Sequence, residues 1–158
     1  MEIVAFCCHN SLNNISRKSK DTSIKVSLYQ NAFKMITRRQ GGGDGSVLDN
    51  TLEKPTTKPT LVKFECKLVL LPCSSKIEVG HLLSTFERGA DGVMVIGCQG
   101  GKCQFVDGSI MAKGRVLYTK RLLNEIGLGE EKIEFFTLSN GEGFLEAVEI
   151  MKERVRKL

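Results

Sequence analysis

Four short, nearly continuous apolar runs are the feature of this sequence that most restricts its fold. They cover residues 3–6, 66–71, 92–96 and 133–138, and each is followed by cysteine, proline, glycine or serine. Runs of this length that carry no polar face, and that end at turn residues, are typical of strands buried on both faces of a parallel sheet. The sequence therefore predicts four such strands.

Helical patterns lie between these runs and after the last one. Apolar residues recur at helical spacing over residues 77–88, 109–126 and 141–158, and Gly89 and Gly127 follow the first two segments as helix stops. Strands that alternate with helices imply parallel pairing through right-handed crossovers. We expect a three-layer α/β domain with a sheet of about four strands, flavodoxin-like or Rossmann-like in outline.

Residues 9–60 interrupt this rhythm. Within them, residues 27–39 carry Leu, Ala, Phe and Ile at helical spacing and predict a helix, which the glycines of residues 41–45 would end. Residues 50–60 contain two prolines and four threonines and no core pattern, which indicates a loop or linker. We therefore expect residues 1–158 to form a single domain with an irregular insertion at about residues 40–60.

Composition and charge exclude several classes of function. The net charge of +5 comes from 23 basic and 18 acidic residues, and most of the excess falls in residues 1–60 rather than on one binding face. With 6% aromatic residues and no tryptophan, a base-stacking platform for nucleic acid is not expected. No apolar run is long enough to span a membrane, and no signal segment or hydrolytic motif is present, so we expect a cytoplasmic protein.

Six cysteines indicate metal or redox chemistry, because a reducing compartment disfavours structural disulfides. Four cysteine sites fall at or just beyond the C-terminal ends of predicted strands, where open α/β sheets bind their ligands. Cys66 begins its strand, so it belongs to the opposite edge and is left out of the site. The four sites are Cys7-Cys8, Cys73, Cys98 and Cys103.

The spacing of Cys98 and Cys103 helps to choose a metal. Four thiolates suit either a structural zinc ion or an iron–sulfur cluster, but C-x₄-C is a spacing of plant-type ferredoxins, whereas zinc pairs usually lie closer in sequence. Gly100 and Gly101 would let the intervening backbone aim N–H groups at cluster sulfurs, and Lys102 would place a positive charge nearby. These three residues are the predicted cofactor-binding loop, and no catalytic residue is predicted.

The same residues resemble a known family. The segments that carry the resemblance are Ala5 to Ser11, Pro72 to Lys76, Phe86 to Val93, Gly97-Cys98, Lys102-Cys103 and Asp107-Gly108. They look like the delta subunit (MvhD) of methyl-viologen-reducing hydrogenase, over residues 1–11 and roughly 61–158. The resemblance implies a small electron carrier with one [2Fe–2S] cluster, which is not catalytic by itself.

The resemblance also implies partners and ligands. Such a subunit joins an HdrA-like FAD and iron–sulfur flavoprotein to a second redox module in an anaerobic, electron-bifurcating type of oxidoreductase complex. That module would be of the hydrogenase, formate dehydrogenase, methylenetetrahydrofolate reductase or benzoyl-CoA reductase type. The implied ligands are Cys8, Cys73, Cys98 and Cys103, with Cys7 as the substitute for Cys8.

One departure from the family keeps other functions open. Many family members continue the first motif as C-x-x-C, whereas Ser11 stands in that position here. One alternative is therefore a docking subunit of the same complex that carries no cluster. The other alternative is a zinc-stabilised binding domain or a small redox enzyme.

Overall fold

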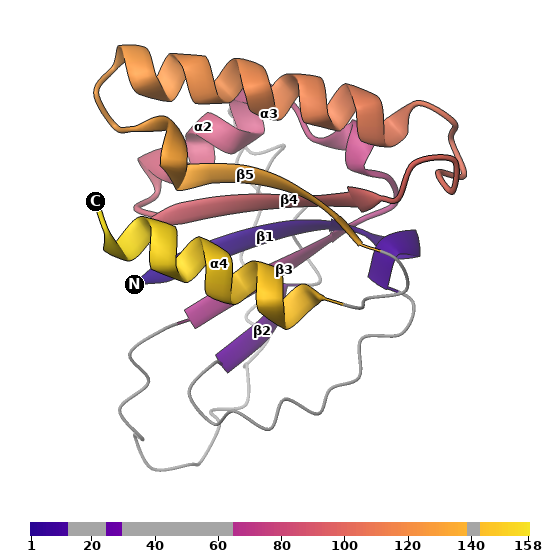
Figure 1. The fold of residues 1–158 in the computed structure, drawn as a ribbon, viewed down its shortest axis with the longest axis horizontal. Helices are drawn as coiled ribbons and strands as arrows, with labels where there is room; N and C mark the ends of the chain where they lie inside the picture. The colour runs from indigo at the N-terminus through magenta and orange to yellow at the C-terminus, as the bar shows by residue number, and fades with distance from the viewer. Residues whose placement is uncertain (13–24, 30–64, 139–142) are drawn as a thin grey trace, which may run out of the picture.

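The computed structural model describes residues 1–12, 25–29, 65–138 and 143–158. Its centre is a five-stranded parallel sheet in the order β2-β3-β1-β4-β5 (Figure 1). The strands are β1 (Glu2–Cys8), β2 (Lys25–Tyr29), β3 (Glu65–Leu71), β4 (Gly92–Cys98) and β5 (Ile133–Leu138). The α-helices of the described residues are α2 (Val79–Glu87), α3 (Gly108–Glu125) and α4 (Phe144–Arg156).

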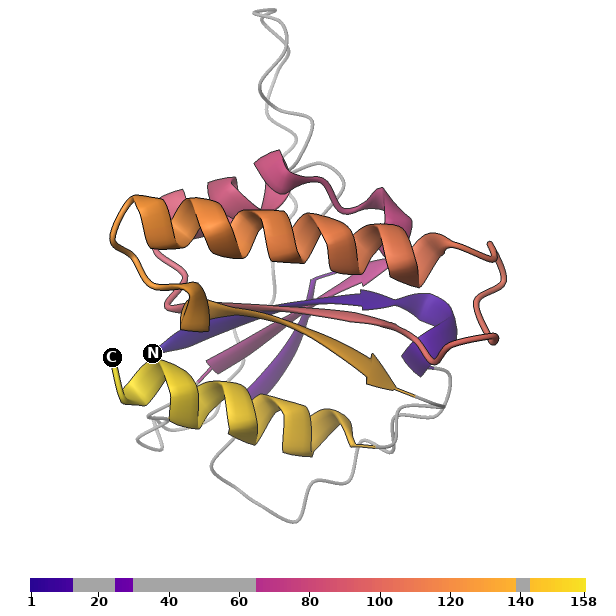
Figure 2. The ribbon, with the colours of Figure 1, turned by 45° about the horizontal axis from the view of Figure 1, so that its top comes forward.

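The helices form two layers, with α2 and α3 over one face of the sheet and α4 over the other (Figures 1 and 2). Each face has its own apolar core. Val4, Phe6 and Val95 point toward α2 and α3, whereas Ile3 and Ile96 point toward α4. The predicted three-layer α/β fold is therefore confirmed, and β1, β3, β4 and β5 occupy the four predicted strands.

Helices α2 and α3 also begin and end close to their predicted bounds. Gly89 and Gly127, which follow them, have φ of +92° and +77°, a conformation that glycine adopts at little cost. The helix expected over residues 141–158 is observed from Phe144 onward. Amphipathic spacing and glycine stops were thus sufficient to locate all three helices.

The helix predicted for residues 27–39 is wrong where the structure tests it. Residues 27–29 belong to β2, which adds a fifth strand by pairing with β3 from Lys25↔Glu65 to Tyr29↔Val69. In Lys25 to Tyr29 polar and apolar residues alternate up to Leu28, a period that suits a strand, and pairing with the existing sheet overrides the local helical spacing. The rest of that segment, like the insertion expected at residues 40–60, lies outside the described residues.

The order of the strands places a switch point beside β1. β1 lies between β3 and β4 in the sheet. The chain therefore adds β2 and β3 on one side of β1 before it crosses to the other side to form β4 and β5. Without β2, the order β3-β1-β4-β5 is that of the first four strands of a flavodoxin-like sheet. Ligands of such sheets bind outside the carboxyl ends of the strands at this point, which here lies between the ends of β1 and β4.

No helix in the described part of the chain is long and apolar enough to cross a membrane.

Candidate functional site

Cys8 and Cys98 meet at the switch point, because they are the last residues of the neighbouring strands β1 and β4. Both are buried, and their sulfur atoms lie 3.5 Å apart, within reach of an S–H···S contact. Two thiolates bound to one tetrahedral ion at about 2.3 Å lie about 3.8 Å apart. This pair therefore needs little movement to bind one metal ion.

A second pair of thiols lies at the start of α3. Cys73 follows β3, Cys103 belongs to the loop after β4, and both face Gly108, the first residue of the helix. A Cβ on Gly108 would lie 2.6 Å from the sulfur of Cys73 and 3.1 Å from that of Cys103, so no larger residue fits here without displacing them. The glycine thus allows both sulfurs to approach one point at the end of the helix.

Polar hydrogens surround this second pair. The Ser75 hydroxyl and backbone N–H donate to the Cys73 sulfur over 3.2 and 3.5 Å. The backbone N–H groups of Phe105, Gly108 and Ser109 favour the thiolate form of Cys103. Such donors stabilise a thiolate, and N–H groups at the beginning of a helix also bring the positive end of its dipole.

Cys98 of the first pair and Cys103 of the second differ in their ease of ionisation. Burial above all, and then the hydrogen bond with Cys8, raises the pKa of the Cys98 thiol to about 12. Burial also acts to raise the pKa of Cys103, but the hydrogen bonds to its sulfur outweigh burial, and its pKa falls below the ordinary value. Cys98 therefore needs a bound cation to become a thiolate, whereas Cys103 is already inclined to ionise.

The pairs lie near one another without forming a single closed set. Repulsion from Cys103 contributes to the raised pKa of Cys98, and the Cys8 thiol lies 3.9 Å from the carbonyl oxygen of Pro72, next to Cys73. Among the described residues, however, no group of three or more His, Cys, Asp or Glu side chains has the geometry needed to hold one metal ion. The predicted ligands are thus brought to one edge of the sheet as two pairs.

The other two cysteines lie elsewhere. Cys7 and Cys66 are fully buried in the core that faces α4, and Cys66 is the second residue of β3, at the far end of the sheet from the pairs. Burial raises the pKa of Cys7 well above its ordinary value, with repulsion from Cys66 and Cys8 adding to it, and burial raises the pKa of Cys66 to about 12. The geometry favours Cys8 over Cys7 as a site residue.

The predicted cofactor-binding loop is exposed. Gly100, Gly101 and Lys102 lie on the surface between β4 and Cys103, and Gly101 has φ of +75°, which suits glycine. A Cβ on Gly100 or Gly101 would meet no atom within 4 Å, so neither glycine is required for packing. Their part in holding a cofactor stays a prediction, while Ser75, Phe105, Gly108 and Ser109 supply the sulfur contacts described above.

Sequence reasoning missed these residues. Ser75 follows the Pro-Cys turn, and Gly108 and Ser109 open α3, so each had a local structural explanation. The only available signal was Gly108 itself, a helix-opening glycine five residues after a cysteine. Ser11 also proves to be structural, since its buried hydroxyl donates to the Cys8 carbonyl oxygen over 2.7 Å.

Comparison with known proteins gives a family match. Residues 53–158 match the family model of the methyl-viologen-reducing hydrogenase delta subunit. The chain belongs to this family. Three of the four paired cysteines, Cys73, Cys98 and Cys103, lie within the matched residues, whereas Cys8 lies before them.

Several individual relatives are iron-sulfur subunits of F420-non-reducing hydrogenases. The chain is 40% identical over 94 residues to the D-type iron-sulfur subunit of the vhu F420-non-reducing hydrogenase of Methanocaldococcus jannaschii, covering 58% of this chain and 70% of the relative. It is 36% identical over 95 residues to the D-type iron-sulfur subunit of the F420-non-reducing hydrogenase of Archaeoglobus profundus, covering 58% and 69%.

A different kind of relative contains a similar segment within a much longer chain. The A-type subunit of the ferredoxin:CoB-CoM heterodisulfide reductase of Methanosarcina mazei is 32% identical over 77 residues, which are 49% of this chain and 10% of that protein. A module similar to this one thus occurs both in separate hydrogenase subunits and as a small part of a heterodisulfide reductase chain.

Proposed function

We propose that this chain is the iron–sulfur electron-transfer subunit of an oxidoreductase complex, with one [2Fe–2S] cluster held by Cys8, Cys73, Cys98 and Cys103. The observation that carries the proposal is the collection of these four thiols at the C-terminal edge of the sheet, beside its switch point. When bound, such a cluster accepts and releases single electrons.

The donor set fits a two-iron cluster better than a single ion. Zinc in a structural site requires four ligands around one centre, and the described thiols form two pairs. A [2Fe–2S] cluster takes four cysteines, two for each iron. Gly108 supports the same assignment, because it keeps clear the space beside Cys73 and Cys103 that a Cβ would fill.

The surrounding residues would bind the cluster and adjust its potential. Donors to the Cys73 and Cys103 sulfurs, chiefly Ser75 and Ser109, favour the more negative, reduced state and so raise the reduction potential. Asn10, whose amide lies 3.9 Å from the Cys98 sulfur, is the corresponding side chain at the other pair. The exposed Lys102 adds positive charge to the same edge.

The proposed partners are an HdrA-like flavoprotein on one side and a second redox module on the other, in an electron-bifurcating type of complex. The names of the relatives support a hydrogenase as the second module. Formate dehydrogenase, methylenetetrahydrofolate reductase and benzoyl-CoA reductase modules remain the other proposals. Six free cysteines suit a reducing compartment, and we propose a cytoplasmic location.

Iron and acid-labile sulfide analysis of the anaerobically purified chain tests the cluster. We expect about two iron atoms and two sulfides per chain, with visible absorption that bleaches on reduction. Zinc in a one-to-one ratio would instead identify a zinc-stabilised domain.

A cluster-free docking subunit is the second candidate, and Ser11 favours it. This residue stands where many family members have a cysteine, and its side chain is buried and engaged with the Cys8 carbonyl. Metal-free protein that still assembles with an HdrA-like partner in an anaerobic preparation would establish this candidate and overturn the cluster.

A further inference from the structure

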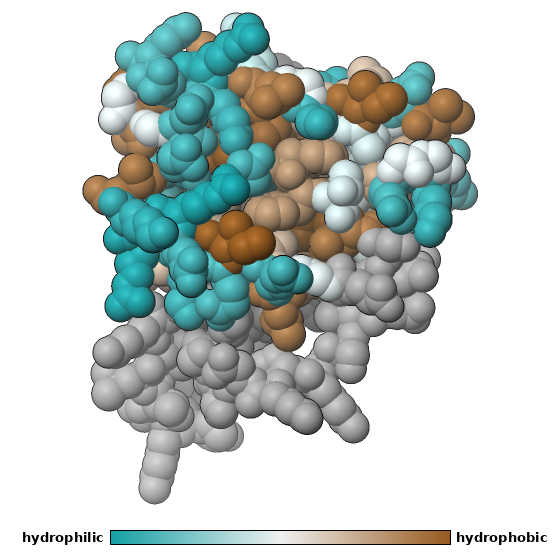
Figure 3. All heavy atoms as spheres, in the orientation of Figure 1, coloured by the Kyte–Doolittle hydropathy of each residue, from teal (hydrophilic) through white to brown (hydrophobic). Residues whose placement is uncertain are grey.

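The solvent side of α3 and the loop before it carry an unusual amount of exposed apolar surface. The loop side chains Phe105 and Val106 are 60% and 80% exposed, and Ile110 of the helix is 70% exposed. In Figure 3, brown patches lie at the centre and right of the upper edge, where α3 runs, among hydrophilic residues. The residues of this surface, called the α3 face below, are Phe105, Val106, Ile110, Met111, Leu117 and Tyr118. Six exposed large apolar side chains within fourteen residues of the chain indicate an interaction site.

Helical periodicity places several of these residues on one line. Ile110, Leu117 and Tyr118 are separated by seven and eight residues and therefore share one side of α3. Gly114 and Arg121 lie on the same side, four and eleven residues after Ile110. The buried side of the helix, which includes Val116 and Leu123, packs on the sheet. The α3 face is thus a second apolar side of the helix, on which each apolar side chain is at least 50% exposed.

Gly114 in the middle of this face is costly unless another molecule needs it. A glycine inside a helix weakens the helix relative to alanine. A Cβ on Gly114 would meet no atom within 4 Å, so no contact within the described residues requires a glycine. A glycine flanked by Ile110, Leu117 and Tyr118 forms a notch into which the backbone of another helix can approach closely.

The loop supports the same interpretation. Val106 has φ of +56°, which is strained for a β-branched residue. Backbone hydrogen bonds from Val106 to Cys103 and from Asp107 to Phe105 hold this conformation. The strained turn places Phe105 and Val106 at the surface next to the helix, and strain of this kind is typical of functional segments.

We propose that the α3 face binds an α-helix of the HdrA-like flavoprotein, an amphipathic helix that crosses at Gly114 and carries acidic residues beside its apolar side. This inference rests on the proposed function for the identity of the partner. The acidic character follows from Lys113 and Arg121, which are exposed beside the apolar residues and have no ionic partner among the described residues.

Charge also argues against a second copy of this chain. A symmetric crossing of two α3 helices at Gly114 would bring the two Lys113 ammonium groups to the same contact, where they repel. A partner with carboxylates in these places avoids the repulsion.

The α3 face continues into the thiol site. Gly108, at the beginning of α3, contacts Cys73 and Cys103, and Ser109 donates to the Cys98 carbonyl oxygen over 2.9 Å. A helix bound along Ile110 and Gly114 would therefore lie near the end of α3 at which Cys73 and Cys103 meet. Docking on this face brings the partner close to the proposed cluster, as electron transfer requires.

The test compares Gly114→Leu with Gly80→Leu, since Gly80 in α2 is also exposed and has no atom within 4 Å of an added Cβ. Affinity is measured for the HdrA-like flavoprotein of the same source, with both proteins prepared anaerobically. Gly114→Leu should raise the thermal midpoint of the isolated chain by a few degrees and weaken binding at least tenfold. Gly80→Leu should leave the affinity within twofold.

Charge reversal provides a second comparison. Arg121→Glu should weaken binding about tenfold and reduce its dependence on salt, whereas Arg156→Glu, on the exposed end of α4, should do neither. Both variants change a surface side chain and should fold normally.

The outcomes separate the two proposals. Unchanged affinity in Gly114→Leu and Arg121→Glu, with wild-type binding intact, overturns the α3 face and leaves the proposed function standing. Failure of the wild-type chain to bind the HdrA-like flavoprotein overturns both. Self-association of the wild-type chain that Gly114→Leu abolishes, measured by sedimentation, would assign the α3 face to a second copy and overturn the acidic partner.

Discussion

At the N-terminal ends of the strands charged side chains pair with one another, whereas at the C-terminal ends thiols gather with few charges to balance them. Lys67 of β3 pairs with Glu2 of β1, and Asp91 before β4 accepts from the Glu2 backbone N–H over 2.6 Å. At the other edge, Cys8 and Cys98 contact only uncharged groups in the contacts described above. Charged groups at the N-terminal edge of the sheet are thus paired within the chain, whereas the thiols at the C-terminal edge are the groups that would bind the proposed cluster.

The cysteines sharpen this comparison, because the same side chain occurs in both settings. Cys66 is near the N-terminal edge, buried in an apolar core, and Cys103 is near the C-terminal edge with backbone N–H donors around it. Their pKa values move in opposite directions for that reason. The polar hydrogens around the sulfur, rather than residue type, thus separate Cys103 from a structural thiol such as Cys66.

Replacing a thiol at each edge should have the largest effect. We expect Cys98→Ser or Cys103→Ser to abolish the visible absorption and the EPR signal of the reduced protein, because each removes a proposed ligand. Cys66→Ser should retain both, although a buried hydroxyl will lower its stability. Full iron content in both ligand variants would show that the cluster, if present, is bound elsewhere.

Alkylation of the metal-free chain should separate the two edges by rate. Cys103 is partly exposed and has a lowered pKa, so it should react with iodoacetamide first and reach half its maximal rate at a lower pH than free cysteine. Cys7 and Cys66 should react at least tenfold more slowly until the chain unfolds, because they are fully buried. Peptide mass spectrometry would measure this order, and early labelling of Cys66 would contradict it.

Gly108→Ala tests the space between the second pair of thiols. Its Cβ would lie 2.6 Å from the Cys73 sulfur, so we expect iron content to fall several-fold while the helical content is retained. Gly80→Ala in α2 is the matched control, because a Cβ there meets no atom within 4 Å and Gly80 lies outside the proposed site. Equal iron content in the two variants would show that the space beside Gly108, between the Cys73 and Cys103 sulfurs, is not needed for metal binding.

The sequence was sufficient for the parts of the fold that local patterns determine. The runs that became β1, β3, β4 and β5 are apolar enough to be recognised alone, and their ends place Cys8, Cys73 and Cys98 at one edge. The spacing of Leu28 with later apolar residues was compatible with a helix, and only pairing with β3 makes residues 25–29 a strand.

The contacts within the site could not be predicted in the same way. That Cys8 is paired with Cys98, and Cys73 with Cys103, depends on strand order and on the direction in which α3 begins. Neither is visible in the spacing of cysteines along the chain. The exposed side of α3 was also hidden, because its apolar residues are indistinguishable in sequence from those of a core.

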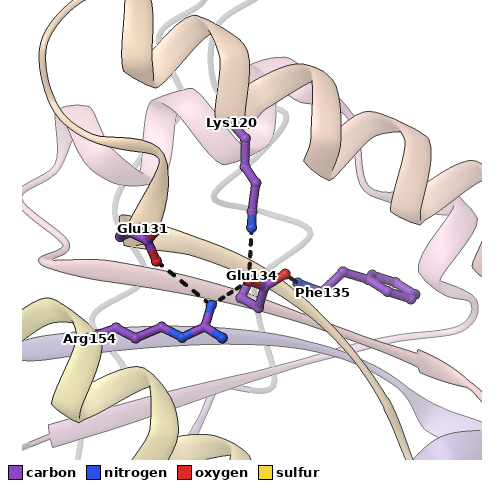
Figure 4. Close-up of polar contacts among 5 residues, drawn as sticks. All are labelled: Lys120, Glu131, Glu134, Phe135 and Arg154. Atoms are coloured by element: carbon purple, nitrogen blue, oxygen red, sulfur yellow. Dashed lines mark hydrogen bonds and ion pairs between the residues drawn. The ribbon is translucent and has the colours of Figure 1, made fainter.

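Glu134 provides the smallest expected effect and the clearest test that the two edges are independent. It is the second residue of β5, at the edge away from the thiols, and it links both helical layers. Its carboxylate pairs with Lys120 of α3 over 2.8 Å and with Arg154 of α4, while its second oxygen accepts from the Phe135 N–H over 3.0 Å (Figure 4). Arg154 also approaches Glu131 at 3.9 Å (Figure 4).

Burial of Glu134 acts to raise its pKa, but these contacts, led by Lys120, outweigh burial and lower the pKa of the carboxyl below its ordinary value. The stabilisation is therefore present above the pKa of the unfolded chain and is lost as the pH falls through the lower pKa of the folded one. Glu134→Gln should lower the free energy of unfolding by about 1–2 kcal/mol at pH 7. It should also weaken the loss of stability at acidic pH, because an amide cannot be titrated. Urea unfolding between pH 3 and 7 measures both. Glu149→Gln is the control, because its carboxylate pairs with Lys152 of the same helix at 3.4 Å. Iron content should not change in either variant, and a loss in Glu134→Gln beyond that explained by unfolding would mean that the two edges of the sheet are coupled.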